Sequence, residues 1–453
     1  MHTSIVKHIV YPVRDLVDRL KGYNSMKYYG ELMKSQWFTP VQLEDLQRKK
    51  LRVLLEHAYT NVPYYHKMFK DIGLKPDDIN SMEDLSKLPV ITKKDIIENF
   101  SDLIAKNIPK RDLITITTSG TTGEPFKMYR DRNEVGKRNA TRFRIFTTIG
   151  FEPGDKLVTL RVYPFSVSFW LNGLFLKTIR NEWRPHDSYL RVENSERFVN
   201  QLVKYKPKFI RGLPSTIYHV ARYMESSGMD SIKLKGILTN GECLYDYQRK
   251  LIQNQFDCEV FDMFGFRETC VYSYECTEHA GYHTATENGI IEIVKEGEHV
   301  SSGELGATLF TDFNNFAMPL IRYVSGDLAV YSGEKCACGR GLPLIIKSVE
   351  GRFNDGIVSK DGRFIPCRPL VQIFGNIKAI KGFQIIQKTK DKILIKIVKE
   401  ANYSQKDTEH ILNGIKKCVG SDIDIEVEYV EAIELARSYK SRLVISDFQA
   451  NFI

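Results

Sequence analysis

A repeated alternation of strand-like and helix-like segments between residues 140 and 268 narrows the fold of this chain to a few classes. A strand, a tight turn and a helix are indicated over residues 206–224, the same order recurs over 234–256, and another strand begins at Cys258. Strands that alternate with helices form parallel sheets with crossover helices. The middle of the chain is therefore predicted to be α/β, with ligands at the loops beyond the strands.

The segments on either side have different patterns. Apolar residues recur at helical spacing over 5–20, which predicts an amphipathic helix that is begun or interrupted near Pro12. It is expected to pack on its own protein, and peripheral contact with a membrane is the alternative. Short strands and turns after Tyr282 indicate an antiparallel or barrel-like subdomain. Strands with one helix after Gly351 indicate a small α+β unit.

We therefore predict an α/β plus α+β protein. A large N-terminal domain holds parallel sheets, helices and a small β-barrel-like subdomain, and a small mobile α+β domain follows it. The predicted division is a helical N-terminal segment over 1–100, the core of the large domain over 101–351 and a C-terminal lid over 352–453. The hinge is expected at GRFNDG, residues 351–356, because Gly and Asn/Asp suit a turn that changes conformation.

Composition limits the possible partners. The 453 residues exceed one ordinary core, and 42% hydrophobic and 27% charged residues are typical of a soluble globular protein. The net charge of +9 favours an acidic ligand such as a nucleotide, coenzyme A or an anionic sugar. Nucleic acid is not expected, because basic and acidic residues are interleaved. Eight irregularly spaced cysteines and an N-terminus without a secretory pattern indicate the cytoplasm.

Residues 117–127, TTSGTTGEPFK, are unusually rich in small polar residues. Eight of the eleven are Thr, Ser, Gly or Pro, and an apolar, β-branched run precedes them, so a strand is expected to lead into this loop. Free backbone N–H and hydroxyl groups can surround an anion, and Lys127 adds a positive charge. A solvated linker is the alternative. No GK[ST] follows the glycines, so a P-loop NTPase is excluded.

The loop SGTTGEP followed by Lys127 resembles the signature loop of the adenylate-forming superfamily. That superfamily includes acyl-CoA synthetases, peptide-synthetase adenylation domains and luciferases. From about Leu51 to the C-terminus the chain resembles its phenylacetate–CoA ligase and CapK-like branch. The resemblance implies that the loop binds the β- and γ-phosphates of ATP, with Thr121 also catalytic. The implied phosphate-binding residues are Thr118, Ser119, Gly120, Thr121, Thr122, Gly123 and Lys127.

Two further loops follow predicted strands, and we expect them at the same edge of the parallel sheet as the Thr/Gly loop. Phe264-Gly265 and Glu268 are similar to the family's aromatic-Gly-x-Thr-Glu motif, in which the aromatic ring lies against adenine and the Glu holds Mg²⁺. Arg267 replaces the usual Thr and is assigned to the α-phosphate. Gly241-Glu242 resembles the segment beside the adenine. Read without the family, each loop is an ordinary turn.

The C-terminal third adds three implied contacts. MPLIRYVSGDL is similar to the family's Arg-Tyr-x-x-Gly-Asp stretch, which assigns Asp327 to the ribose hydroxyls. Arg352 resembles the hinge arginine that also reaches the nucleotide, with Asp355 as the pivot. Lys440 resembles the lysine that enters the site from a C-terminal loop, although Tyr439 stands where the family has Gly. A lysine in a basic tail is otherwise a solvated charge.

Metal-ligand spacing appears independently of the nucleotide motifs. Cys276 and His283 are followed by Cys336-x-Cys338, and three thiolates with one imidazole form a standard tetrahedral Zn²⁺ set. The ion would be structural, and CapK-like relatives show a similar pattern. His279 is the alternative imidazole, and free buried cysteines are the alternative to a metal.

The combined reading is an ATP-dependent, AMP-forming carboxylate ligase. It would turn a small-molecule carboxylate into an acyl-adenylate, release pyrophosphate and transfer the acyl group to coenzyme A. An amine or a hydroxyl of a sugar in capsular polysaccharide synthesis is the other acceptor considered. The rival is a zinc-containing nucleotide-binding or scaffold protein with weakened catalysis, which the substitutions at Arg267 and Tyr439 favour. The sequence leaves the acid, the acceptor and the oligomeric state open.

Overall fold

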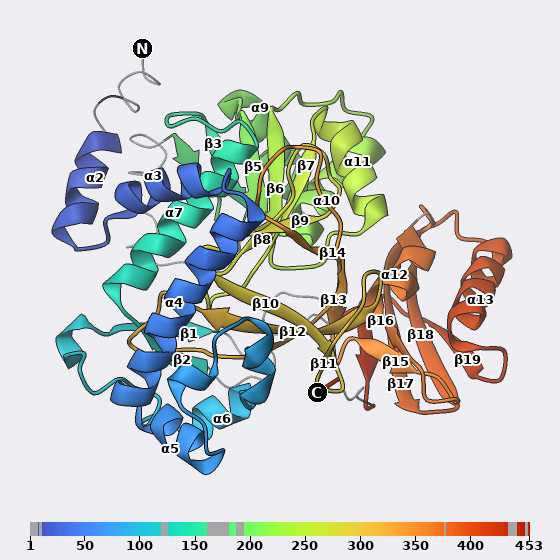
Figure 1. Cartoon of the computed structure of the whole chain (residues 1–453). Coiled ribbons are helices and arrows are strands. Elements are labelled where there is room, and N and C mark those ends of the chain that lie inside the picture. Colours follow the sequence, from blue (N-terminus) through green and yellow to red (C-terminus); the bar gives the residue numbers. More distant parts are fainter. Residues whose placement is uncertain are drawn as a thin grey trace.

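The computed structural model describes residues 8, 11–118, 126–160, 181–186, 194–375, 377–433, 442–448 and 452–453. A large N-terminal part is followed by a smaller C-terminal part that lies beside it (Figure 1). The α-helices are α2 (Tyr11–Leu20), α3 (Ser25–Ser35), α4 (Pro40–Asn61), α5 (Pro63–Asp71), α6 (Lys93–Glu98), α7 (Arg132–Thr148), α9 (Ser195–Tyr205), α10 (Pro214–Ser226), α11 (Asp246–Phe256), α12 (Cys367–Gly375) and α13 (Gln405–Val419). The strands of the large part are β1 (Ile114–Thr118), β2 (Phe126–Arg130), β3 (Leu157–Leu160), β4 (Glu182–Trp183), β5 (Phe209–Gly212), β6 (Gly236–Asn240), β7 (Val260–Phe264), β8 (Ser273–Tyr274), β9 (Tyr282–Thr284), β10 (Gly289–Lys295), β11 (Glu298–His299), β12 (Leu305–Asp312), β13 (Tyr323–Tyr331) and β14 (Leu344–Arg352).

One mixed sheet organises the large part. Over the described residues its order is β11-β10-β12-β13-β14-β9-β8-β7-β6-β5-β3-β4. The strands β4, β3, β5, β6 and β7 run parallel, and the pairs from β7 to β11 are antiparallel. The predicted fold class is confirmed. The antiparallel strands expected after Tyr282 belong to the same sheet as the parallel strands. Strands β8 and β9 connect the two halves of that sheet.

The parallel strands are covered on both faces, which explains their continuous apolar sequences. Adjacent residues of β6 point to opposite faces. Ile237 packs with helices α9, α10 and α11, whereas Leu238 packs with Ile145 and Phe146 of α7. The loops after β6 and β7 are therefore held at the edge of a sheet that is fixed from both sides.

The N-terminal helices surround the antiparallel half and α7. Helix α4 begins with a capping box between Thr39 and Gln42, and its apolar side joins a core that includes Leu54 and Tyr65. The predicted amphipathic helix is present as α2, but Leu20 is 78% exposed, and Val13, Leu16 and Val17 are also exposed. Among the described helices, none has both the length and the hydrophobicity to cross a bilayer.

The C-terminal part has its own core. Its remaining strands are β15 (Gly356–Val358), β16 (Phe364–Pro366), β17 (Ile380–Thr389), β18 (Lys392–Lys399), β19 (Asp424–Tyr429) and β20 (Val444–Ser446). Four of them form a sheet in the order β19-β18-β17-β20, and α12 and α13 supply apolar side chains to its core. Phe452 returns to the large part, where it packs among Val294, Leu309 and Leu328.

Candidate nucleotide site

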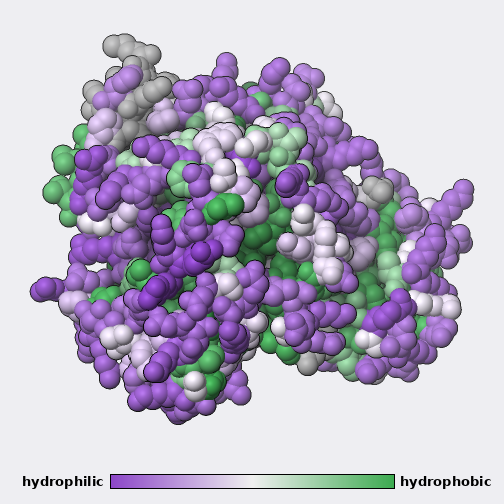
Figure 2. Space-filling view, viewed as in Figure 1, coloured by the Kyte–Doolittle hydropathy of each residue, from purple (hydrophilic) through white to green (hydrophobic). Residues whose placement is uncertain are grey.

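A cleft between the two parts collects eight of the residues predicted for the nucleotide site. Its volume is about 3010 Å³. Figure 2 shows a mostly hydrophilic outer surface with hydrophobic residues gathered between the two parts. The predicted residues that line the cleft are Gly241, Glu242, Phe264, Gly265, Arg267, Glu268, Asp327 and Arg352.

The Thr/Gly loop is placed differently from the expectation. It follows a strand, but β1 pairs with β2 in a separate antiparallel sheet in which Thr118 lies opposite Phe126. The loop therefore closes a hairpin and does not follow a strand of the parallel sheet. The ammonium of Lys127 lies over Tyr129, 5.0 Å from its ring centroid, and Lys127 does not line the cleft. The predicted residues Ser119, Gly120, Thr121, Thr122 and Gly123 lie outside the described residues.

Glycines shape the two loops that follow β6 and β7. Gly241 has φ +90°, a backbone conformation that L side chains rarely adopt. Its neighbour Glu242 accepts a hydrogen bond from the backbone N–H of Ser215 at 3.2 Å, which ties the loop to the start of α10. A Cβ at Gly265 would lie 2.3 Å from Cδ1 of Tyr272, so only glycine fits between Phe264 and the following residues.

Arg138 of α7 fixes the loop that contains Arg267 and Glu268. Its guanidinium donates to the backbone carbonyls of Phe266 at 3.3 Å, Arg267 at 3.0 Å and Thr269 at 2.5 Å. Glu134, one turn earlier on α7, is a fully buried partner of the same guanidinium. Because α7 directly follows the β1–β2 hairpin, one helix connects that hairpin to the loop after β7. Arg138 was not predicted, since nothing in the sequence distinguishes it from other helical arginines.

Glu268 faces the cleft as a carboxylate without an ion pair to any described residue. Burial raises its pKa, and the negative charge of Asp327 raises it further. A hard divalent cation that prefers oxygen ligands would relieve both effects. The chemistry at this position therefore fits Mg²⁺.

Asp327 and Arg352 lie opposite each other on the adjacent strands β13 and β14. The Nε–H of Arg352 donates to Oδ1 of Asp327 at 3.1 Å. Asp355 follows in the predicted hinge segment and accepts a hydrogen bond from Nε–H of Arg442 at 3.2 Å. Arg442 was not predicted, and it stands two residues after Lys440, which lies outside the described residues.

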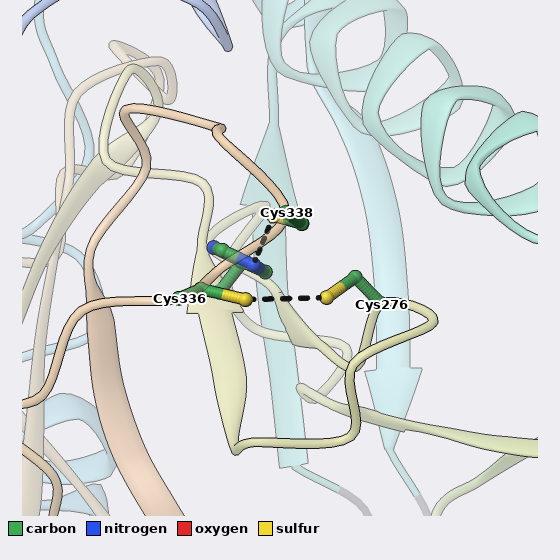
Figure 3. Close-up of side chains that lie close together, drawn as sticks. Cys276, Cys336 and Cys338 are labelled. Carbon is green, nitrogen blue, oxygen red and sulfur yellow. Dashed lines mark hydrogen bonds between the residues drawn. The ribbon is translucent and has the colours of Figure 1, made fainter.

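The four predicted zinc ligands come together away from the cleft. Cys276, His283, Cys336 and Cys338 have ligand atoms that all lie within 4.8 Å of one another, and His279 is not in this group. The sulfurs of Cys276 and Cys336 point toward each other at 3.5 Å (Figure 3). All eight cysteines are free thiols.

The imidazole of His283 is oriented for metal binding. Its Nδ1 lies 2.8 Å from the carbonyl oxygen of Leu342 and must donate to it, because a carbonyl only accepts. Nε2 therefore carries the free electron pair, and it lies 3.2 Å from Sγ of Cys338. A tetrahedral zinc with bonds of about 2.3 Å separates sulfur ligands by roughly 3.8 Å. The donor set thus fits Zn²⁺.

The chain is similar in sequence to two kinds of known protein, phenylacetate–coenzyme A ligases and CapK. Residues 357–447 match the CapK C-terminal domain family. The chain is 26% identical to a phenylacetate–coenzyme A ligase of Pseudomonas putida over 72% of this chain and 74% of the relative. It is 23% identical to the protein CapK of Staphylococcus aureus over 99% of this chain and all of the relative.

Solved structures agree with the sequence matches. The fold is similar to a 2-hydroxyisobutyryl-CoA ligase in its postadenylation state, with a TM-score of 0.75, 19% identity and 90% of each chain covered. The same ligase in its thioesterification state gives a TM-score of 0.59 at the same coverage.

The fold, the cleft and these matches place the chain in the adenylate-forming superfamily of ligases. Within that superfamily, the chain belongs to the branch of phenylacetate–CoA ligases and CapK-like proteins.

Proposed function

We propose that the protein is an ATP-dependent, AMP-forming carboxylate ligase that makes an acyl-adenylate. The observation that supports this most directly is the convergence of Glu242, Glu268, Asp327 and Arg352 on one cleft from separate stretches of the chain. The carboxylate of Asp327 pairs with Arg352 at 3.1 Å, and Glu268 lines the same cleft, so one cleft offers a carboxylate for a ribose and another for a metal-bound phosphate.

Four residues of the cleft have distinct roles in this reaction. Asp327 accepts hydrogen bonds from the ribose hydroxyls, and the ring of Phe264 lies against the adenine. Arg267 is exposed in the cleft and has no ion pair with a described residue, so its guanidinium is free to bind the α-phosphate. Mg²⁺ held by Glu268 would neutralise phosphate charge as pyrophosphate departs.

The first half-reaction joins the two substrates. A carboxylate oxygen attacks the α-phosphorus, the bond from that phosphorus to the bridging oxygen breaks, and pyrophosphate carries away the electron pair. Lys127 and the Thr/Gly loop (Thr118, Ser119, Gly120, Thr121, Thr122 and Gly123) are proposed to hold the β- and γ-phosphates. Lys440 is proposed to place its ammonium beside the reacting carboxylate, with residues 352–453 acting as the mobile lid.

In the second half-reaction, an acceptor attacks the acyl carbon and AMP leaves. Coenzyme A is the first acceptor we propose, in agreement with the names of the ligase relatives. The full-length match to CapK and the CapK C-terminal domain support a second candidate, an amine or hydroxyl acceptor in capsular polysaccharide synthesis.

ATP–pyrophosphate exchange over a panel of carboxylic acids tests the first half-reaction, and addition of each acceptor tests the second. Lys440→Ala should abolish exchange while AMP binding and thermal stability persist. The matched control is Lys406→Ala, an exposed lysine of α13 that should change nothing. An unchanged rate in Lys440→Ala would remove that lysine from the mechanism, and failure of the wild type to bind ATP would refute the function.

We also propose that Cys276, His283, Cys336 and Cys338 hold one structural zinc ion. It would join the strands β8 and β9 to the loop before β14. Elemental analysis should give about one zinc per chain. Cys336→Ser should lose the metal and lower the melting temperature, whereas Cys418→Ser, on α13, and His279→Ala should keep it. Purified protein without zinc, or loss of zinc in His279→Ala, would contradict the assignment.

A further inference from the structure

Arg142 of α7 faces the cleft without a partner. It lines the cleft, is half-buried, and has no hydrogen bond or ion pair with any residue that the structure describes. Arg138 lies four residues earlier and therefore on the same face of the helix. That arginine is fully occupied by Glu134 and by the loop after β7. Of these two arginines, Arg142 is therefore the one whose guanidinium is available to bind a ligand.

None of the described acids that line the cleft forms an ion pair with Arg142. A guanidinium stays protonated in proteins, so burial leaves its charge in place. Glu134 is used by Arg138 and Arg130. Glu242 accepts the backbone N–H of Ser215. A ligand that enters the cleft can therefore supply the anion that pairs with Arg142.

The position of Arg142 indicates which part of the ligand it would meet. Arg138 holds the loop of Glu268, and Phe146, one turn beyond Arg142, lies 5.6 Å from the guanidinium carbon of Arg211 on β5. Arg142 thus lies between the loop of Glu268 and the parallel strands. Asp327 lies on the other side of that loop, in the antiparallel half. If the ribose is bound at Asp327, the acid joined to the α-phosphate extends toward Arg142.

We propose that Arg142 binds a second anionic group on the acid, at the end remote from the carboxylate that is activated. The substrate class is then a dicarboxylic acid or a phosphorylated carboxylic acid. This inference rests on the proposed adenylation reaction. A guanidinium suits both groups, because its parallel N–H donors match either carboxylate or phosphate oxygens.

Pyrophosphate exchange with paired acids tests the inference. Each dicarboxylic or phosphorylated acid is compared with a neutral isostere, in which a monoamide or methyl ester replaces the second anion. The wild type should show a KM at least tenfold lower for the charged member of a pair. Arg142→Gln should remove that preference by raising the KM of the charged acid about ten- to a hundredfold, with kcat within about twofold. Arg142→Lys should restore part of it, and Arg48→Gln, an exposed arginine of α4, should change nothing.

The outcomes distinguish failure of the second-anion site from failure of the adenylation reaction. Equal KM values for the paired acids, exchange with the neutral isosteres alone, or an equal effect of Arg142→Gln on both members would overturn the second-anion site and leave adenylation intact. Absence of exchange with every acid, in a folded protein, would overturn adenylation itself and the inference with it.

Discussion

Replacement of Arg138 by Met tests whether one buried side chain sets the position of Glu268. Arg138 is 7% exposed, and besides the three backbone carbonyls of the loop it contacts Glu134 and the hydroxyl of Tyr272, the latter at 2.6 Å. Removing one member of a buried ion pair costs about 3–5 kcal/mol, because the other charge stays buried. One kcal/mol lowers the melting temperature by about 2–4 °C in a unit of 150–250 residues and by less in a larger one, so the melting temperature should fall by about 5–10 °C.

Arg144→Met is the matched control on the same helix. Arg144 is fully buried and pairs with Glu287 at 2.6 Å, but it does not contact the loop after β7. Both variants should therefore lose a similar amount of stability. Only Arg138→Met frees the carbonyls that hold Glu268 in place, and a displacement of about 1 Å in such a group can cost a hundredfold in rate.

The assay is pyrophosphate exchange at a temperature where both variants are folded, with the Mg²⁺ concentration varied. We expect Arg138→Met to lose about a hundredfold in kcat/KM for ATP and to need more Mg²⁺, with Arg144→Met within about twofold of the wild type. An equal loss of activity in the two variants, or unchanged exchange in Arg138→Met, would refute the reasoning.

Three further changes have definite expected outcomes. Because burial raises the pKa of Glu268, its ionised form destabilises the fold above that pKa, so Glu268→Gln should raise the melting temperature at pH 8 and lose this gain in acid. Wild-type exchange should fall as pH decreases through the same pKa, and pH profiles of both quantities check the sign. Asp327→Asn should weaken AMP binding by about tenfold or more, as measured by calorimetry. Gly136→Ala should lower stability in urea by about 1–3 kcal/mol, because its Cβ would lie 1.8 Å from the carbonyl oxygen of Tyr23, whereas Gly30→Ala in α3 has open space and should not destabilise.

The parallel half of the fold and the loops at its edge could be read from the sequence. The strands β5, β6 and β7 are short apolar runs followed by turn residues, and their order along the chain fixes where Gly241 and Glu268 must lie. The cysteine cluster could also be predicted, because thiol and imidazole spacing carries its own chemistry.

The rest depends on pairing that sequence periodicity does not encode. The Thr/Gly loop lies in a hairpin because β1 pairs with β2. The sequence could not predict this, because a single β-branched run does not specify which strand it pairs with. The role of helix α7 in holding the loop after β7 could not be predicted, because α7 buries the charged residues Glu134, Arg138 and Arg144 in the core. A helix that buries charged residues lacks the usual apolar stripe, so its inward face could not be identified before the ion pairs were seen.

The pairing of Asp327 with Arg352 across neighbouring strands has a thermodynamic consequence. Strand β14 ends at Arg352, and the C-terminal part begins only four residues later, at Gly356. In the proposed site, a ribose bound to Asp327 would share one carboxylate with this arginine. A rotation of the C-terminal part that moves Arg352 away from Asp327 would change the affinity for nucleotide. By thermodynamic linkage, nucleotide binding would shift the equilibrium of that rotation by the same free energy. The ion pair between these two neighbouring strands can thereby couple the occupancy of the cleft to the orientation of the C-terminal part.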